Sequence, residues 1–411
     1  MFIKGKTKLR GHVEVSSSKN AILPILAASI LTDEPVCIKK VPYINDVIII
    51  SQLIRALGVT VEQKEHCLYL SGGLQSTYPP YDLVRQIRAS FLLMGPLLAR
   101  QGEVRVSLPG GCAIGNRPID LHLKGFHALG AEICLSSGDV VARTNGLKGT
   151  HIYLDYPSVG ATENIMMAAA VAEGTTYIEN AALEPEVIDL ANFINSMGGS
   201  VKGTGTNVIR IKGVKELHGI EYTPIPDRIE AGTYMIAVAA TEGNAMIHNV
   251  IPEHVKAVTA KLIESGAQIT EEENVIIVER SGKIRPIYIK TLPYPGFPTD
   301  MQAQMMAYLT SAEGSSVISE SVFENRFMHV QELTRMGADI KTEGRTAIVR
   351  GVDRLTGAKV KATDLRAGAA LVIAALNVDG ESVICNSEHV DRGYEAIIDK
   401  LNAMGACIRS E

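Results

Sequence analysis

The chain has 411 residues, of which 46% are hydrophobic and 21% are charged, and its formal net charge at pH 7 is −5. This length exceeds what one ordinary hydrophobic core spans and predicts two domains of about 200 residues each. A slightly acidic chain has no bulk attraction for nucleic acid, and its apolar runs are far shorter than the ~20 residues of a membrane-spanning helix. We therefore expect a globular protein with no nucleic-acid partner and no membrane partner.

The six cysteines are spaced singly, without a Cys-x-x-Cys pair or a His/Cys cluster. This spacing is not typical of a structural zinc site or of the disulfide framework of a secreted domain. The basic N-terminal segment is not followed directly by the apolar stretch of a secretory signal. The sequence also has no P-loop, no Gly-x-Gly-x-x-Gly after a strand and no His-Glu-x-x-His. We therefore expect a cytoplasmic protein that holds no metal and needs no cofactor such as ATP or a nicotinamide.

A pattern of about 70 residues occurs six times along the chain. Each copy has a glycine or turn, a short β-like run, a loop, an amphipathic helix and a closing glycine, which is the residue type expected just beyond a helix end. In the third copy, the apolar residues between Val187 and Met197 recur at helical spacing. The closing glycines follow one another at steps of 68 to 72 residues: Gly58, Gly130, Gly198, Gly266, Gly337 and Gly405.

A second pattern repeats in phase with the first. The run Ile3-x-Gly5-x3-Leu9-x-Gly11 recurs around Gly213, 208 residues after Gly5, and again around Gly351, 138 residues after Gly213. Each copy leads into a second helix that is apolar almost all round, and a helix of this kind is buried. In chain order, the six apolar helices are expected to begin near Lys19, Arg88, Thr162, Glu230, Asp300 and Arg366.

Six units of this size can form a solenoid, a ring or two clusters of three. The sequence shows neither the capping units nor the shorter period of a solenoid, which favours two clusters. We predict an α/β fold of α+β repeats, with buried helices inside each domain and sheets outside. The first unit begins in mid-pattern, so residues 1–18 are expected to complete one domain with residues 227–411, while residues 19–226 form the other. The proline-rich segment 222–227 is typical of such a crossing.

Charged side chains stand at or just before the starts of the apolar helices. Equivalent helices in repeats share an orientation, so their N-termini are expected to face one cleft and to favour anions there. Taken singly, a residue such as Arg88 or Arg366 is more often a solvated cap or a salt bridge between domains. Taken together they favour an anionic ligand, because a repeat that needed only caps could use Ser or Asn throughout.

The segment 109–120 combines three glycines with Cys112, and Arg117 follows. Glycine permits positive φ, so this segment is expected to interrupt regular structure and to move as a lid. A thiol near positive charge is favoured as the thiolate, which predicts a reactive cysteine. The alternative is that Cys112 is a small buried hydrophobic residue in an ordinary turn.

The run Pro109-Gly-Gly-Cys-Ala-Ile-Gly-Asn-Arg-Pro-Ile-Asp120 is similar to the active-site loop of the UDP-N-acetylglucosamine enolpyruvyl transferases. The resemblance covers essentially the whole chain, and the family's fold has two inverse α/β barrel domains of three repeats each. The further motifs that carry it are Lys19-Asn20, Ile87–Ser90, Ser158–Thr162, Phe297-Pro-Thr-Asp-Met-Gln-Ala-Gln304, Phe323-Glu-Asn-Arg-Phe-Met-His329, Ala362–Arg366 and Asp391-Arg-Gly-Tyr394.

The resemblance implies transfer of the enolpyruvyl group of phosphoenolpyruvate to the 3-hydroxyl of UDP-N-acetylglucosamine, the first committed step of peptidoglycan synthesis. It implies that Lys19, Arg117 and Arg392 hold the phosphate and carboxylate of phosphoenolpyruvate, which suits the charge and fork geometry of these cations. Cys112 would donate a proton to the methylene carbon. Asp300 would take the proton of the sugar hydroxyl or orient it.

The resemblance also implies a larger set of substrate-binding residues, and covalent inhibition by fosfomycin at Cys112. It implies no cofactor, and we expect a monomer or weak oligomer. The implied substrate-binding residues are Asn20, Arg88, Pro118, Ile119, Asp120, Leu121, His122, Ser158, Val159, Gly160, Val322, Arg326, Asp364 and Arg366.

Three departures from the family pattern concern affinity and lid kinetics. Ser17-Ser18 stands where many members have Gly-Ala, Tyr156-Pro157 where some have Lys-Val, and Asn116 where Ala is more usual. A shikimate-type enolpyruvyl transferase is the nearest rival, and the cysteine in the lid argues against it. A catalytically silent UDP-sugar-binding paralogue is disfavoured because every implied reactive group is present. Another kind of thiol enzyme would need a histidine paired with Cys112.

Overall fold

The computed structural model describes residues 1–108 and 119–410, and contacts divide them into two units. Unit 1 consists of residues 1–16 and 226–410, and unit 2 of residues 17–108 and 119–225. The chain passes from one unit to the other between Ser16 and Ser17 and again between Ile225 and Pro226. Within the described residues, no helix has the length and apolar character needed to cross a bilayer.

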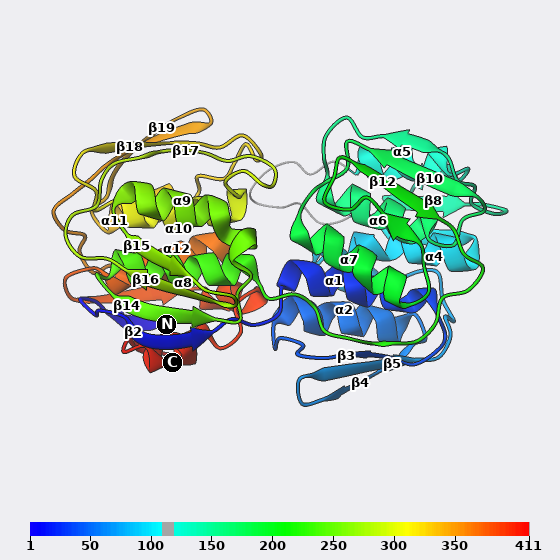
Figure 1. The fold of residues 1–411 in the computed structure, drawn as a ribbon, viewed down its shortest axis with the longest axis horizontal. Helices are drawn as coiled ribbons and strands as arrows, with labels where there is room; N and C mark the ends of the chain where they lie inside the picture. Colours follow the sequence, from blue (N-terminus) through cyan, green and yellow to red (C-terminus); the bar gives the residue numbers. More distant parts are fainter. Residues whose placement is uncertain (109–118, 411) are drawn as a thin grey trace. The chain divides into compact units, whose positions relative to one another are not determined.

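The described part of unit 1 contains three four-stranded sheets and three buried helices (Figure 1). The sheet orders are β15-β16-β14-β2, β17-β18-β20-β19 and β21-β22-β1-β23. The strands are β1 (Phe2–Lys4), β2 (Arg10–Glu14), β14 (Asn244–His248), β15 (Gln268–Glu271), β16 (Val275–Glu279), β17 (Tyr288–Lys290), β18 (Ser315–Ser319), β19 (Asp339–Glu343), β20 (Thr346–Arg350), β21 (Lys359–Lys361), β22 (Glu381–Cys385) and β23 (Cys407–Arg409). The helices are α8 (Arg228–Ala240), η3 (Pro252–Val255), α9 (Lys256–Ser265), η4 (Thr299–Met301), α10 (Gln302–Leu309), α11 (Val330–Arg335), α12 (Leu365–Leu376), η5 (Ser387–Arg392) and α13 (Ile397–Ala403).

The N-terminal segment completes two of these sheets. Strand β1 lies between β22 and β23 and is antiparallel to both, with Phe2 opposite Val383 and Arg409. Strand β2 is parallel to β14, with Arg10 opposite Asn244. Sheets formed mainly by the C-terminal half of the chain therefore depend on its first residues.

The described part of unit 2 repeats the plan with two four-stranded sheets and one three-stranded sheet, in the orders β13-β3-β5-β4, β11-β12-β10-β9 and β6-β8-β7 (Figure 1). The strands are β3 (Val36–Ile38), β4 (Thr60–Lys64), β5 (Cys67–Ser71), β6 (Glu103–Ser107), β7 (Glu132–Ser136), β8 (Asp139–Arg143), β9 (His151–Tyr153), β10 (Thr175–Glu179), β11 (Val201–Lys202), β12 (Val208–Lys212) and β13 (Glu221–Tyr222). The helices are α1 (Lys19–Ala28), η1 (Ser29–Leu31), α2 (Asn45–Ala56), α3 (Tyr81–Val84), η2 (Arg88–Leu93), α4 (Met94–Gln101), α5 (Asp120–Ala128), α6 (Val159–Ala169) and α7 (Pro185–Ser196).

The apolar helices form the cores of the units, as their composition predicts. Every residue of α10, every residue of α12 except Leu365, and every residue of α6 except Val159 and Gly160 is buried. The outer helices bury one face only; α9, for example, buries Val258, Thr259, Leu262 and Ser265. Each of the six closing glycines has positive φ, between 92° and 110°, as expected beyond a helix end. The predicted arrangement of buried helices inside and sheets outside is confirmed.

Two helices begin earlier than their apolar runs predict. Helix α6 begins at Val159 rather than near Thr162, because the Ser158 hydroxyl accepts a hydrogen bond from the Ala161 N–H. Helix α8 begins at Arg228 rather than near Glu230, because the Asp227 carboxylate accepts from two backbone N–H groups. A polar cap can thus start a helix before its hydrophobic residues do.

The first glycine of the second pattern lies against the backbone that follows a buried helix. A Cβ atom added to Gly5 would lie 2.2 Å from the carbonyl oxygen of Val378, and one added to Gly213 would lie 1.7 Å from that of Ala172. No side chain fits at such distances. This close approach explains why glycine recurs at this point of the pattern.

Candidate active site

The structure places the implied site residues in both units. Cys112, Arg117 and Pro118 lie outside the described residues, as does Asn116. Unit 2 carries Lys19, Asn20, Arg88, Ile119, Asp120, Leu121, His122, Ser158, Val159 and Gly160. Unit 1 carries Asp300, Val322, Arg326, Asp364, Arg366 and Arg392.

In unit 1, two arginines hold the carboxylate of Asp300. Arg326 Nη2 donates to Asp300 Oδ1 at 2.7 Å, and Arg366 Nη2 donates to Asp300 Oδ2 at 2.9 Å. Burial raises the pKa of the Asp300 carboxyl, but the charges of Arg366 and Arg326 outweigh it and hold this pKa well below its usual range. Asp300 is therefore ionised and fixed in orientation, with a proton affinity too low for a strong base in this arrangement.

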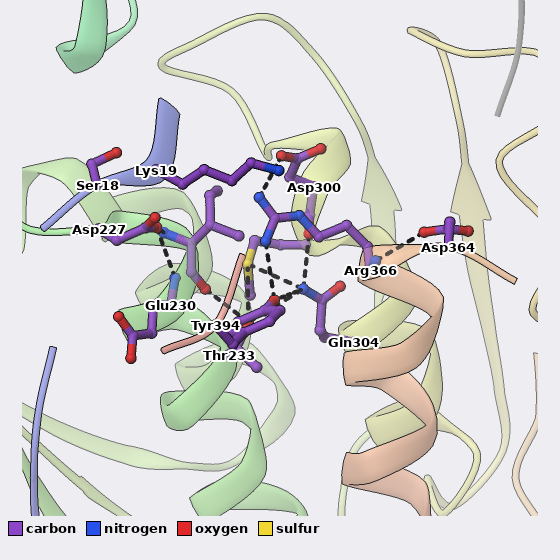
Figure 2. A network of polar contacts seen from close by, with 12 residues as sticks. Ser18, Lys19, Asp227, Glu230, Thr233, Asp300, Gln304, Asp364, Arg366 and Tyr394 are labelled. Carbon is purple, nitrogen blue, oxygen red and sulfur yellow. Dashed lines mark hydrogen bonds and ion pairs between the residues drawn. The ribbon is translucent and has the colours of Figure 1, made fainter. Parts of the chain in front are cut away.

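Helix α12 positions Arg366 at its N-terminus. Asp364 is the N-cap residue, and its Oδ1 accepts from the N–H groups of Arg366 at 2.8 Å and Ala367 at 3.0 Å. The guanidinium of Arg366 is buried, and its pKa is raised by Asp300 against the opposing effect of burial. Figure 2 shows the side chain of Arg366 turned from the helix start toward Asp300 and Tyr394. Asp364 thus fixes the helix turn that carries the cation.

The buried carboxylate of Glu320 fixes the loop that contains Val322. Its Oε1 accepts from the N–H groups of Val322 at 2.8 Å and Phe323 at 3.1 Å and from the hydroxyl of Thr291 at 2.8 Å. Its Oε2 accepts from the hydroxyl of Thr299 at 2.8 Å. Because Thr299 directly precedes Asp300, one carboxylate joins the Val322 loop to the backbone of the Asp300 turn.

In unit 2, Lys19 is the first residue of α1 and is buried. The Ser18 hydroxyl caps the helix by accepting from the Ala21 N–H, and Lys19 Nζ lies 2.8 Å from Asp46 Oδ2. Asp46 is in the first turn of α2 and is also buried. Helix α1 therefore presents an ordered ammonium group at the end where its dipole also favours an anion. Asn20 follows and is half-buried.

Asn164 fixes the tautomer of the neutral His122 imidazole. Asn164 Oδ1 accepts from the Gly95 N–H at 2.7 Å, so its Nδ2 is the donor to the Phe91 carbonyl at 2.9 Å and to His122 Nδ1 at 3.1 Å. Burial, with a smaller effect of Arg88, lowers the pKa of His122 to about 3. Since Nδ1 accepts, the remaining proton is on Nε2, which makes that atom a hydrogen-bond donor.

His122 also lies beside the first turn of α6. A Cβ atom added to Gly160 would lie 3.3 Å from His122 Cε1 and 3.5 Å from Nε2. Ser158, Val159 and Gly160 are each half-buried at this helix start. The implied residues 158–160 and His122 are therefore brought together, although 36 residues separate Ser158 from His122 in the sequence.

Several residues that support the site were not identified from the sequence. Gln304 and Tyr394 are the last residues of the family motifs 297–304 and 391–394, so the sequence did offer a signal for these two polar side chains. Glu320 and Asn164 lie outside these motifs. A single sequence does not reveal hydrogen-bond partners that are tens of residues away, so neither residue could be identified. No group of three or more His, Cys, Asp or Glu side chains within the described ranges is arranged to hold a metal ion.

The chain belongs to the family described as EPSP synthase (3-phosphoshikimate 1-carboxyvinyltransferase), which it matches over residues 3–401. It is 58% identical over 410 residues to UDP-N-acetylglucosamine 1-carboxyvinyltransferase 2 of Carboxydothermus hydrogenoformans, covering 99% of this chain and 98% of the relative. It is also 58% identical over 400 residues to UDP-N-acetylglucosamine 1-carboxyvinyltransferase 1 of Caldanaerobacter subterraneus subsp. tengcongensis, covering 97% and 96%. The resemblance found in the sequence is confirmed.

Two solved structures share the fold. The enolpyruvyl transferase NikO from Streptomyces tendae matches with a TM-score of 0.89 at 25% identity, over 99% of this chain and 98% of that chain. EPSP synthase from Acinetobacter baumannii matches with a TM-score of 0.76 at 19% identity, over 98% of each chain. The predicted fold class is confirmed by these matches.

Proposed function

We propose that this chain is a transferase that moves the enolpyruvyl group of phosphoenolpyruvate to the 3-hydroxyl of UDP-N-acetylglucosamine, releases phosphate and serves peptidoglycan synthesis. The observation that carries the proposal is the 58% identity, over nearly the whole chain, to relatives named UDP-N-acetylglucosamine 1-carboxyvinyltransferase. The ordered Asp300 carboxylate and the Lys19 ammonium supply two of the groups that such chemistry needs.

Lys19, Arg117 and Arg392 are proposed to hold the phosphate and carboxylate of phosphoenolpyruvate, with Asn20 beside them. A substrate with about three negative charges needs several cations, and a guanidinium fork matches both anionic groups. Lys19 is supported by its position at the start of α1 and by its ion pair with Asp46. Arg392 ends η5 and is half-buried.

Cys112 is proposed as the acid of an addition–elimination reaction. Its thiol proton adds to the C3 methylene carbon of phosphoenolpyruvate while the sugar 3-oxygen, which loses its own proton, bonds to C2. The Cys112 thiolate then takes back a proton from the new methyl group while the C2–O bond to phosphate breaks, which restores the double bond. The proton of the sugar hydroxyl leaves with the phosphate. The products are the enolpyruvyl ether and inorganic phosphate, so atoms and charges balance.

Asp300 is proposed to orient the sugar hydroxyl by accepting its hydrogen bond. The low pKa that Arg366 and Arg326 give this carboxyl favours an acceptor over a strong base. If the hydroxyl displaces one arginine, the basicity of Asp300 rises at the moment when the hydroxyl is in place. Orienting the hydroxyl and taking its proton both require the ionised carboxylate of Asp300.

The remaining implied residues of unit 2 are proposed to bind the UDP-sugar. His122 offers an Nε2–H donor beside the start of α6, and Arg88 offers a half-buried cation. Proline and tyrosine at Tyr156-Pro157 supply no ammonium group, so a lysine contact to the nucleotide is not proposed. In unit 1, Val322, Arg326, Asp364 and Arg366 are proposed to complete the sugar-binding surface around Asp300.

The test is phosphate release from phosphoenolpyruvate, with UDP-N-acetylglucosamine and shikimate 3-phosphate offered separately. We expect release with the nucleotide sugar alone. Release with shikimate 3-phosphate alone would assign the rival shikimate-type activity, and release with neither would contradict both.

Three further proposals accompany this function. The protein's two domains are residues 19–226 and residues 1–18 with 227–411. The enzyme is inhibited covalently by fosfomycin at Cys112. It is a monomer or a weak oligomer in solution, which analytical ultracentrifugation at micromolar concentration tests directly.

A further inference from the structure

The hydroxyl of Tyr394 lies at the junction of the three buried helices of unit 1. Tyr394 is 1% exposed and follows η5, whose last residue is Arg392. Its hydroxyl oxygen is 3.0 Å from Thr233 Oγ1 on α8, 3.2 Å from Gln304 Nε2 on α10 and 3.2 Å from Arg366 Nη1 on α12. Figure 2 shows these side chains converging on the tyrosine.

The direction of each hydrogen bond follows from the donors available. Thr233 donates its only hydroxyl proton to the Ile229 carbonyl at 2.7 Å, so Thr233 Oγ1 is the acceptor for Tyr394. Gln304 Nε2 and Arg366 Nη1 can only donate, so the tyrosine oxygen accepts from both, and Gln304 Nε2 lies at the same distance, 3.2 Å, from Thr233 Oγ1. The hydroxyl therefore uses its one donor and both of its acceptor positions.

Both donors to Tyr394 also hold Asp300. Gln304 Nε2 donates to the backbone carbonyl of Asp300 at 2.9 Å, and Arg366 Nη2 donates to its Oδ2 at 2.9 Å. The tyrosine thus acts on the backbone of Asp300 through one partner and on the carboxylate through the other. Among the described residues, no hydrogen bond joins the tyrosine hydroxyl to the Asp300 carboxylate itself, so its role is indirect.

We propose that Tyr394 is a positioning residue for the reaction proposed above: its hydroxyl fixes the side chains of Arg366 and Gln304 so that the Asp300 carboxylate has a single orientation toward the sugar hydroxyl. The expected effect on the reaction rate rests on the proposed function. The restraint of the Arg366 side chain by Tyr394 does not depend on any substrate.

Tyr394→Phe is the central variant, and Tyr308→Phe is its matched control. Phenylalanine keeps the ring, including the ring face 5.5 Å from the Arg366 guanidinium carbon, and removes only the hydroxyl. Tyr308 is also 1% exposed in unit 1, and its hydroxyl pairs with Ser265 Oγ at 2.9 Å, outside this network. Both variants lose one buried hydroxyl, so both are expected to lower the melting temperature.

The kinetic constants separate positioning from stability. For Tyr394→Phe we expect kcat to fall about tenfold, the effect of losing one well-placed hydrogen bond, with each KM changed less than about twofold. For Tyr308→Phe we expect kcat to stay within about twofold of the wild type. Equal kcat values in the two variants would overturn the proposal.

A double-mutant cycle tests whether the tyrosine acts through Arg366. In an Arg366→Lys background, Tyr394→Phe should lower kcat by clearly less than the tenfold expected in the wild type, because the Arg366 route is already gone and only the Gln304 route remains. A further tenfold loss in that background would contradict the proposed route.

A measurement without substrate separates this inference from the proposed function. In ¹⁵N-arginine-labelled protein, the Nη signals of Arg366, assigned with Arg366→Lys, should be resolved in the wild type and in Tyr308→Phe because the guanidinium rotates slowly. They should merge in Tyr394→Phe. Unchanged signals would overturn the inference, whereas a wild type that releases no phosphate would overturn only the proposed function.

Discussion

The ammonium group of Lys19 lies 2.8 Å from the carboxylate of Asp46, and both side chains are buried, with 11% and 5% of their surfaces exposed. Lys19→Met removes the cation from this pair and leaves Asp46 with one partner fewer in a poorly solvated place. We expect a loss of about 3 kcal/mol in the free energy of unfolding, together with loss of turnover. Urea denaturation followed by circular dichroism measures the first effect.

Lys124→Met is the control for that prediction. Lys124 forms an ion pair of similar length, 2.7 Å, with Asp155 in the same unit, but 44% and 69% of these side chains are exposed. Solvent screening limits such a pair to about 1 kcal/mol or less. Equal destabilisation by the two lysine variants would show that burial of the Lys19 pair has no energetic effect.

The pH dependence of activity should show no acidic limb from Asp300 above pH 4. Because the folded pKa of Asp300 lies well below its usual range, the carboxylate stays ionised as the pH falls from 8 to 4. The stability that this ionisation contributes is present above the unfolded pKa and is lost only as the pH falls toward the lowered value. Asp300→Asn should lower kcat at least about 100-fold at every pH in this range. An acidic limb near pH 6 that disappears in the variant would contradict the assigned pKa direction.

His122 should make unit 2 sensitive to mild acid. Its folded pKa of about 3 lies below the unfolded value of about 6.5, so only the unfolded chain takes up a proton between these values. The stability contribution is therefore complete above pH 6.5 and declines as the pH falls. His122→Gln should show a shallower decline of the free energy of unfolding between pH 6.5 and 4. A decline in His122→Gln as steep as that of the wild type would show that the neutral imidazole of His122 is not the cause.

A methyl group at Gly213 should be strongly destabilising. The added Cβ would lie 1.7 Å from the Ala172 carbonyl oxygen, so the strand end and the turn after α6 must separate. We expect Gly213→Ala to cost about 3 kcal/mol. At Gly73 the added atom would meet only the Asp33 carboxylate, at 3.3 Å, and Gly73→Ala should cost less than about 1 kcal/mol. Differential scanning calorimetry of the two variants distinguishes a backbone clash from a general preference for glycine.

Replacement of Cys112 tests the proposed acid. Cys112→Ser should lose turnover, because a hydroxyl is too weak an acid, whereas Cys112→Asp should keep part of the rate and resist fosfomycin. Alanine at Cys37, Cys67, Cys134, Cys385 or Cys407 should affect stability at most. Full activity of Cys112→Ser in the phosphate-release assay would refute the assignment.

Periodicity in the sequence was sufficient to predict the repeat, the buried helices and the sheets, because each follows from local spacing and from glycine at fixed points. Helix starts were displaced where a polar cap such as Asp227 preceded the apolar run. The polar supports of the site could not be predicted in the same way. Glu320 joins Thr291, Thr299 and the Val322 loop through contacts that exist only after folding, and a single sequence has no periodic signal for them.

The position of β1 between β22 and β23 has a consequence for synthesis on the ribosome. Phe2 pairs with residues 381 and 407 positions further along the chain, so the sheet that contains it cannot close until residue 409 has emerged. The described residues of unit 2 all lie between Ser17 and Ile225, so they have all been made once residue 225 has been added. Unit 2 can therefore fold during translation, while β1 lacks its partner strand β23 until residue 409 has been made.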